Sequence, residues 1–145
     1  MGRKSHGEDY TDAELDFIAS VAHSVQCGID YAFGLPELYQ WGLMGEGYKA
    51  QMKASVRAVL VHDKSPKSLH GAWVSRLTQE GWVHGEVKDA EKKTHPLLVP
   101  FDELPIEWKL RLRQFRAAVI PFRKTKNTVR SNLIPFSKNR TDLGT

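Results

Sequence analysis

Four of the six histidines are the side chains best able to bind a metal ion or transfer protons. No two of them have the His-x-x-x-His spacing that places two ligands on one helix face, and Cys27 has no second cysteine to complete a zinc pattern. The sequence therefore predicts no metal site and no cofactor. We expect His70 and His95 to hydrogen-bond to the backbone, and His84 to face a ligand or solvent. The four histidines are His23, His70, His84 and His95.

Carboxylates are the other groups that could act as acid and base. Four of them lie within residues 89–103, but an acid–base pair cannot be assigned without geometry. The sequence has no Gly-x-Ser-x-Gly motif, P-loop or dinucleotide fingerprint, and Gly81 and Gly85 are too sparse for a phosphate cradle. We therefore expect a protein that is not an enzyme. The carboxylates are Asp89, Glu91, Asp102 and Glu103.

Apolar residues at three- and four-residue steps predict four amphipathic helices that would position these groups. The first begins at the capping-box pattern of Thr11 and Glu14, the third at Ser65-Pro66, and the fourth at Pro105. The expected helices cover about residues 12–34, 48–61, 66–80 and 105–119.

Two short extended segments are expected between the third and fourth helices. They are residues 82–84 and the continuous apolar run 97–99, on either side of the charged turn 88–93. A length of 145 residues with 41% hydrophobic residues suits one domain with a buried core. The sequence thus predicts a mainly α-helical α+β fold with about four helices and short β-strands.

Location is indicated by what the sequence lacks. It has no apolar run near the roughly 20 residues that span a bilayer, and residues 1–10 are too polar for a signal peptide. A single cysteine suits a reducing compartment. We expect a cytoplasmic protein in which Cys27 is a buried structural thiol.

Basic charge is concentrated at the C-terminus. Residues 1–120 carry 15 Lys and Arg against 16 Asp and Glu, whereas residues 121–145 carry six against one. Such a tail could attract nucleic acid or another polyanion, or it could be a solvated extension. It also repeats an apolar pattern, because Ile120-Pro121-Phe122 recurs as Ile134-Pro135-Phe136, and either copy could dock on the domain or on a partner. The cations first considered for such contacts are Arg123, Lys124, Lys126 and Arg130.

The middle of the chain resembles the RyR domain, a family named after repeats in ryanodine receptors. Residues 70–73, His-Gly-Ala-Trp, are similar to the family's His-Glu-x-Trp, and residues 81–89, Gly-Trp-Val-His-Gly-Glu-Val-Lys-Asp, to its Gly-Trp-x-Tyr-Gly-Pro-x-Lys/Arg-Asp. Residues 94–105 resemble the closing His-Pro block, and His23 resembles a histidine of stand-alone members. The resemblance implies an RyR-like domain at 11–122, between a polar segment 1–10 and a basic extension 123–145. The departures are Gly71, His84 and Glu86.

The resemblance implies a recognition module. RyR repeats of the channels are associated with adenine nucleotide, and stand-alone prokaryotic members with nucleotide signalling and phage defence. We therefore expect a non-enzymatic module that binds a nucleotide or nucleotide-derived signalling molecule, and that sequesters a defence messenger if a phage encodes it. The alternative is a protein- or nucleic-acid-interaction module acting through the basic tail. Assembly into a homo-oligomer stays open.

Residue chemistry supplies candidates for such a ligand. Trp73 could stack on a purine, and Arg76 and Lys88 could meet phosphate oxygens. Both tryptophans also have an alternative role, because Trp73 lies on an apolar helical stripe and Trp82 follows a helix end, so either could pack in the core. The expected ligand-binding residues are His70, Trp73, Arg76, Trp82, His84 and Lys88.

Overall fold

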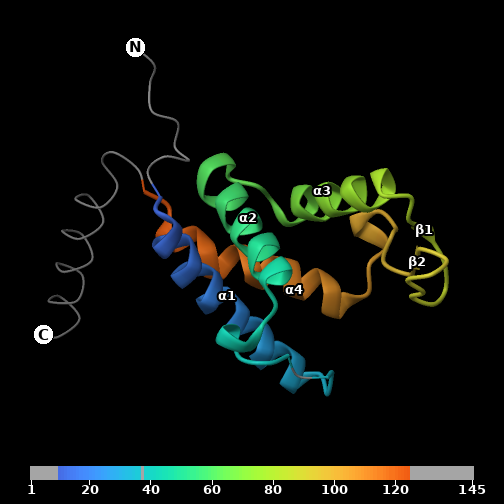
Figure 1. Cartoon of the computed structure of the whole chain (residues 1–145), viewed down its shortest axis with the longest axis horizontal. Coiled ribbons are helices and arrows are strands. Elements are labelled where there is room, and N and C mark those ends of the chain that lie inside the picture. The colour runs from blue at the N-terminus through green and yellow to red at the C-terminus, as the bar shows by residue number, and fades with distance from the viewer. Residues whose placement is uncertain (1–9, 37, 125–145) are drawn as a thin grey trace, which may run out of the picture.

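The computed structural model describes residues 10–36 and 38–124, and its architecture is mainly helical (Figure 1). Within these residues there are four α-helices and a two-stranded parallel sheet, which confirms the predicted α+β class. In this part of the chain no helix is long and apolar enough to cross a membrane. The elements are α1 Asp12–Ala32, η2 Trp41–Leu43, α2 Glu46–His62, α3 Pro66–Gln79, β1 Val83–His84, β2 Thr94–His95, η3 Phe101–Glu103, α4 Ile106–Val119 and η4 Ile120–Phe122.

Helix starts follow the local signals in the sequence. The Thr11 side chain accepts a hydrogen bond from the Glu14 amide at 3.1 Å, and the Glu14 carboxylate accepts one from the Thr11 amide at 2.9 Å. This is the predicted capping box, which satisfies amide groups that have no partner inside the helix. At α3 the Ser65 hydroxyl caps the helix by accepting from the Ser68 amide at 3.1 Å. At the other end of α3, Gly81 has φ +93°, a conformation that glycine adopts without steric cost.

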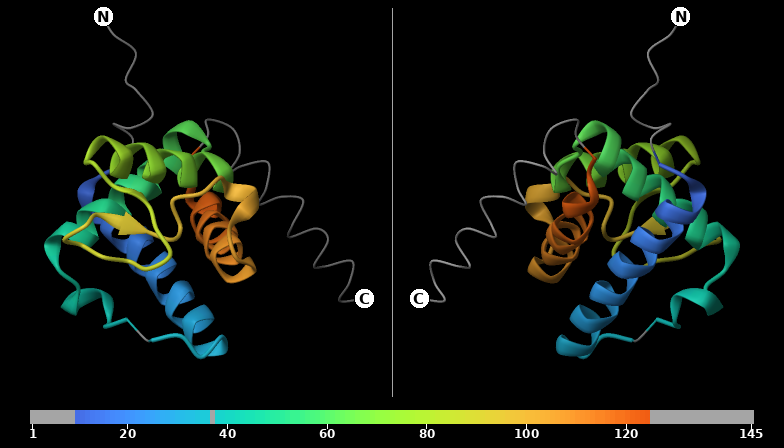
Figure 2. Two further views of the ribbon diagram at one scale, coloured as in Figure 1. Left: turned by 90° about the vertical axis from the view of Figure 1, so that its right-hand side faces the viewer. Right: turned by 90° about the vertical axis from the view of Figure 1, so that its left-hand side faces the viewer.

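The hydrophobic core lies where α1, α2 and α4 meet. Figure 1 shows α1 and α4 side by side with α2 against them, and the end views in Figure 2 place the strands next to α3 at one end of the molecule. One stripe of each helix supplies apolar side chains, as a period of 3.6 residues requires. The buried cluster is Tyr10, Leu15, Ile18, Ala19, Ala22, Val56, Val59, Leu60 and Val119.

The second extended segment was placed wrongly by the sequence. Val83 pairs with Thr94 and His84 with His95, so the strand that partners β1 precedes the apolar run 97–99. Directly after β2 the chain turns, because the Leu98 amide donates to the His95 carbonyl at 3.3 Å. Residues 97–99 lie between two prolines and turn instead of pairing as a strand.

The loop between the two strands is held by its own hydrogen bonds. The Asp89 carboxylate accepts from the amides of Glu91 and Lys92, and the Thr94 hydroxyl donates to the Val87 carbonyl at 2.8 Å. Gly85 lies so close to Thr94 that an added Cβ would be 2.6 Å from the Thr94 Cβ. The loop therefore needs glycine at this position for space.

We predict that Gly85→Ala lowers the free energy of unfolding by about 1–3 kcal/mol, because either the loop or β2 must move to relieve the overlap. Urea unfolding monitored by tryptophan fluorescence measures the change. Gly71→Ala is the matched control, since an added Cβ there meets nothing within 4 Å and lies inside α3, where it should stabilise by about 0.5–1 kcal/mol. Equal stability changes in the two variants would contradict the prediction.

Candidate ligand-binding cavity

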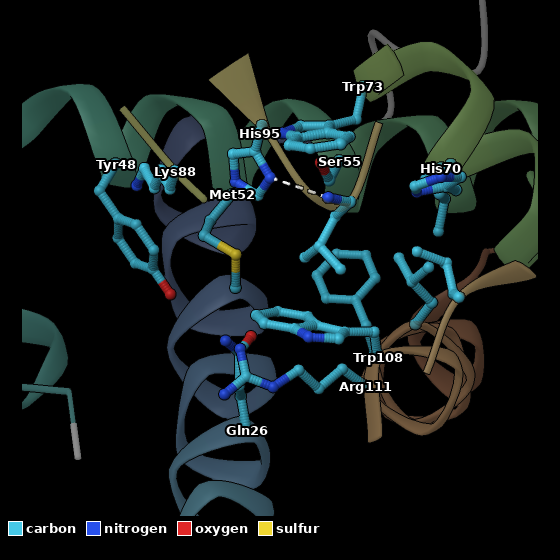
Figure 3. Close-up of a pocket in the computed structure, with 15 residues that line it drawn as sticks. Gln26, Tyr48, Met52, Ser55, His70, Trp73, Lys88, His95, Trp108 and Arg111 are labelled. Atoms are coloured by element: carbon cyan, nitrogen blue, oxygen red, sulfur yellow. Dashed lines mark hydrogen bonds between the residues drawn. The ribbon is translucent and has the colours of Figure 1, made fainter. Parts of the chain in front are cut away.

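A cavity of about 510 Å³ opens between the four α-helices and the β1–β2 loop (Figure 3). Its size falls within the range of small-molecule sites, roughly 300–1,000 Å³. Aromatic and aliphatic side chains make up most of the wall, with a few polar groups among them. The lining residues are Gln26, Tyr48, Met52, Ser55, Leu69, His70, Trp73, Lys88, His95, Leu97, Leu104, Trp108, Arg111, Leu112 and Phe115.

Two indole rings from different helices line this cavity. Trp73 comes from α3 and Trp108 from α4, and Figure 3 shows Trp73 above and Trp108 below, with other side chains of the lining drawn between them. Trp73 is fixed from two sides, because it stacks on His70 at 5.6 Å between ring centroids and meets the edge of His95 at 5.0 Å. Aromatic side chains in the wall of a cavity suit a flat ring as ligand.

His70 and His95 hydrogen-bond to the backbone, as predicted. His70 Nε2 donates to the Val99 carbonyl at 2.7 Å, and the Leu97 amide donates to His95 Nδ1 at 3.1 Å. Because Nδ1 of His95 accepts, the ring carries its proton on Nε2 and is neutral. Burial, together with the positive charge of Lys88, lowers the pKa of His95 below its ordinary value.

Lys88 is an exposed cation on the lining of the cavity. Among residues 10–36 and 38–124 its ammonium group forms no hydrogen bond or ion pair, whereas the nearby Lys93 donates to the Glu80 carbonyl at 2.7 Å. An unpaired ammonium can meet an anion without first breaking an existing contact.

Arg111 is a cation of a different kind. Its guanidinium lies 4.1 Å from the centre of the Trp108 ring and pairs with Asp30 of α1, whose side chain is only 1% exposed. This pairing joins α1 to α4 and supports Trp108 from the arginine side. Since its charge is already neutralised by a buried carboxylate, Arg111 acts on the cavity mainly by holding the Trp108 ring.

Tyr48, which lines the cavity, is bonded to a histidine of α1. His23 Nε2 donates to the Tyr39 carbonyl at 2.6 Å, so its Nδ1 can accept from the Tyr48 hydroxyl at 3.0 Å. Burial and the nearby Asp30 are among the causes that raise the pKa of Tyr48. Cys27, expected to be buried, is only half-buried, because α1 turns that side toward the surface. No three His, Cys, Asp or Glu residues in the described part of the chain could together hold a metal ion.

Three of the six expected ligand-binding residues line the cavity, and three do not. His70, Trp73 and Lys88 are in the wall. The ring of Trp82 lies 6.3 Å from that of His95, so it packs behind the wall, while Arg76 and the exposed His84 lie outside it. The three departures from the family pattern, Gly71, His84 and Glu86, are also outside the lining.

Sequence reasoning missed the residues that α1, α2 and α4 contribute. Trp108 and Arg111 lie in the expected fourth helix, but nothing in the sequence around them indicates a ligand. Gln26 and Tyr48 carry no local signal for a ligand. Their role depends on how the helices are rotated against one another, which periodicity alone does not specify.

The start of the basic tail is bound to the domain. The ring of Phe122 meets the edge of Phe17 at 6.2 Å, so the first Ile-Pro-Phe copy docks on its own domain. Arg123 lies 3.6 Å from Asp63, and Lys124 lies 2.7 Å from Glu14. The other tail residues for which contacts were predicted lie outside the described residues; they are Lys126, Arg130 and the second copy at 134–136.

We predict that Asp30→Asn lowers the free energy of unfolding by about 3–5 kcal/mol, because it leaves the Arg111 charge buried without its partner. Thermal and urea unfolding measure the loss. Asp12→Asn serves as control: Asp12 pairs with Lys53 at 2.9 Å but is 83% exposed, so its loss should cost at most about 1 kcal/mol. Replacing both partners, as in Asp30→Leu with Arg111→Met, should recover much of the stability. A single variant as stable as the parent would contradict the prediction.

We predict that His95 titrates below its ordinary pKa of about 6.5. The folded protein then favours the neutral ring, and the unfolded chain takes up the proton first as pH falls. The contribution of His95 to stability is therefore fully present above about pH 6.5 and is lost progressively as pH falls below that value. NMR titration of the ring measures the pKa. Lys88→Gln should raise it, since Lys88 is one cause of the shift; titration of His95 at or above its ordinary value would contradict this.

Comparison with known families agrees with the motifs at the cavity. The model of the RyR domain matches residues 49–137, which is more than half of the chain. The matched part includes most of α2, together with α3, the two strands and α4, and therefore most of the cavity wall. The limits predicted for the domain, 11–122, stay a prediction. With its helical fold and its sequence match in agreement, this chain belongs to the RyR domain family.

Proposed function

We propose that this protein binds a nucleotide or a nucleotide-derived signalling molecule in the cavity, without turning it over. The observation that carries the proposal is a cavity lined by the two indoles Trp73 and Trp108 together with the unpaired cation Lys88. A base would stack on one of the indoles, and its phosphate would meet the Lys88 ammonium group. Aromatic stacking is worth about 1–3 kcal/mol per base, so an indole face contributes substantially to affinity.

The distribution of charge supports an anionic ligand with one main anchor. Arg111 is paired to Asp30, which leaves Lys88 as the cation of the lining whose charge is not neutralised by a described residue. Its neighbour His95 is neutral, so it can donate from Nε2 without adding charge. Phosphate binding by Lys88 would be charge-assisted, whereas the contribution of Arg76 expected from the sequence is less direct, because Arg76 is outside the wall.

Binding of a signalling nucleotide would by itself have a biological consequence. A module that holds a signalling nucleotide can lower its free concentration or change its own contacts when loaded. If a phage encodes the chain, the first of these would sequester a defence messenger of the host. We propose cytoplasmic action in either case.

The expected experiment is a calorimetric and thermal-shift comparison of Lys88→Gln with the parent, using adenosine and guanosine nucleotides and the matching nucleosides. We predict that Lys88→Gln weakens nucleotide binding by about tenfold or more, since a hydrogen bond to a charged group is worth about 1.5–3 kcal/mol. Nucleoside binding should change little. Trp73→Ala should weaken both classes, because it removes one stacking face.

Lys92→Gln is the matched control, because Lys92 is exposed on the same loop but outside the cavity. It should bind like the parent. Deletion of residues 125–145 distinguishes binding in the cavity from the alternative, an interaction through the basic tail. The deletion keeps Arg123 and Lys124, which contact the domain. Nucleotide affinity that survives this deletion supports the cavity. Absence of any binding across the panel, with the protein folded, would overturn the proposal and favour a macromolecular partner of the tail.

A further inference from the structure

Gln26 contributes a carboxamide group to the cavity wall. It is half-buried on α1, and Figure 3 shows it on the same side of the cavity as Arg111 and the lower indole, Trp108. Its amide forms no hydrogen bond with any residue of the described part of the chain. It is thus a polar group at the cavity that the fold itself leaves unsatisfied.

Several neighbouring polar groups are already committed. The Tyr48 hydroxyl is bonded to His23, and the Arg111 guanidinium is paired with Asp30. Ser55 of α2 also lines the cavity without a bonded partner among described residues, but a hydroxyl rotates freely and can accept or donate in many directions. A carboxamide instead holds one acceptor and one donor side by side in a plane. Gln26 is therefore the group best suited to distinguish one ring from another.

We propose that Gln26 determines specificity by reading the edge of a planar heterocycle stacked on an indole ring of this cavity. The ring would carry a hydrogen-bond donor and an acceptor next to each other, in the complementary order to the carboxamide. This inference rests on the proposed function, since it names the part of the same ligand that lies opposite the phosphate. Paired hydrogen bonds of this kind discriminate by about 1–3 kcal/mol between bases in other recognition sites.

Burial makes the recognition selective. A ligand that fills the cavity removes Gln26 from water, so a ring without the matching groups leaves a buried amide unpaired. Only the ligand without the matching groups loses affinity, and this loss requires no change in stacking or in the contact with Lys88. Gln26 would therefore alter the ranking of bases and leave the preference for phosphate unchanged.

The test uses three probes that share a ribose 5′-monophosphate: adenosine, guanosine and purine-riboside monophosphates. Purine riboside lacks the exocyclic group and so offers no adjacent donor and acceptor. The parent should bind adenosine monophosphate about 5- to 150-fold more tightly than purine-riboside monophosphate. Gln26→Leu should reduce this ratio to near one. Titration calorimetry at one fixed salt concentration gives every value.

Gln26→Glu provides a second, directional readout. A carboxylate only accepts, and guanine presents two adjacent donors, N1–H and the N2 amino group. The variant should shift the ratio of the two affinities toward guanosine monophosphate, even though its negative charge weakens the binding of both. Gln114→Glu is the matched control, because Gln114 is an exposed residue of α4 outside the wall, and it should keep the parental ranking.

Three outcomes can be told apart. Nucleotide binding that depends on Trp73 and Lys88, with a base ranking that changes in both Gln26 variants, supports the inference. The same binding with an unchanged ranking in Gln26→Leu and Gln26→Glu overturns the inference and leaves the proposed function standing. No binding of any probe by the folded parent overturns both.

Discussion

The buried ion pair between Asp30 and Arg111 is the contact on which the cavity depends. It joins α1 to α4 across 81 residues of sequence and lies directly beneath the Trp108 ring. A buried ion pair adds little net stability, because removing both charges from water offsets most of their attraction. Its effect is to select one arrangement, since any slip of α4 along α1 would bury one charge without the other. The position of Trp108 follows from that arrangement.

The hydrophobic core and the cavity lie at opposite ends of the same set of packed helices. Where α1, α2 and α4 meet closely, small and branched residues such as Ala19, Val56 and Val59 fill the space completely. Toward α3 the helices separate, and larger side chains line the gap without filling it. Because the close-packed end fixes how the helices are oriented, we expect the open end to keep its shape. A preformed site avoids the cost of ordering side chains when a ligand binds.

The β1–β2 loop adds chemistry that the helices do not provide. It is short and internally bonded, and its close contact between Gly85 and Thr94 leaves little freedom. Lys88 is thereby placed on the cavity by the backbone while its ammonium group stays exposed. The small sheet therefore serves mainly to position a charge, with His95 in β2 closing the wall behind Trp73.

Local signals in the sequence determined the helices and the family. The capping box at Thr11 and Glu14, the start of α3 at Ser65-Pro66, and the motif around Trp73 and Lys88 each depend on residues a few positions apart, whose interactions hold in almost any surroundings. The apolar run 97–99 was misassigned, because an apolar stretch between prolines is compatible with a strand or with a packed turn.

Only the tertiary structure decided which side chains share the cavity. Trp108, Arg111 and Gln26 come from helices that the sequence predicts well, yet nothing local indicates that they meet Trp73. The angle at which one helix packs against another depends on the fit of many side chains and on the Asp30–Arg111 pair. Half of the expected ligand-binding residues were found in the wall for the same reason: periodicity predicts the inward face of each helix, and only packing brings those faces to one site.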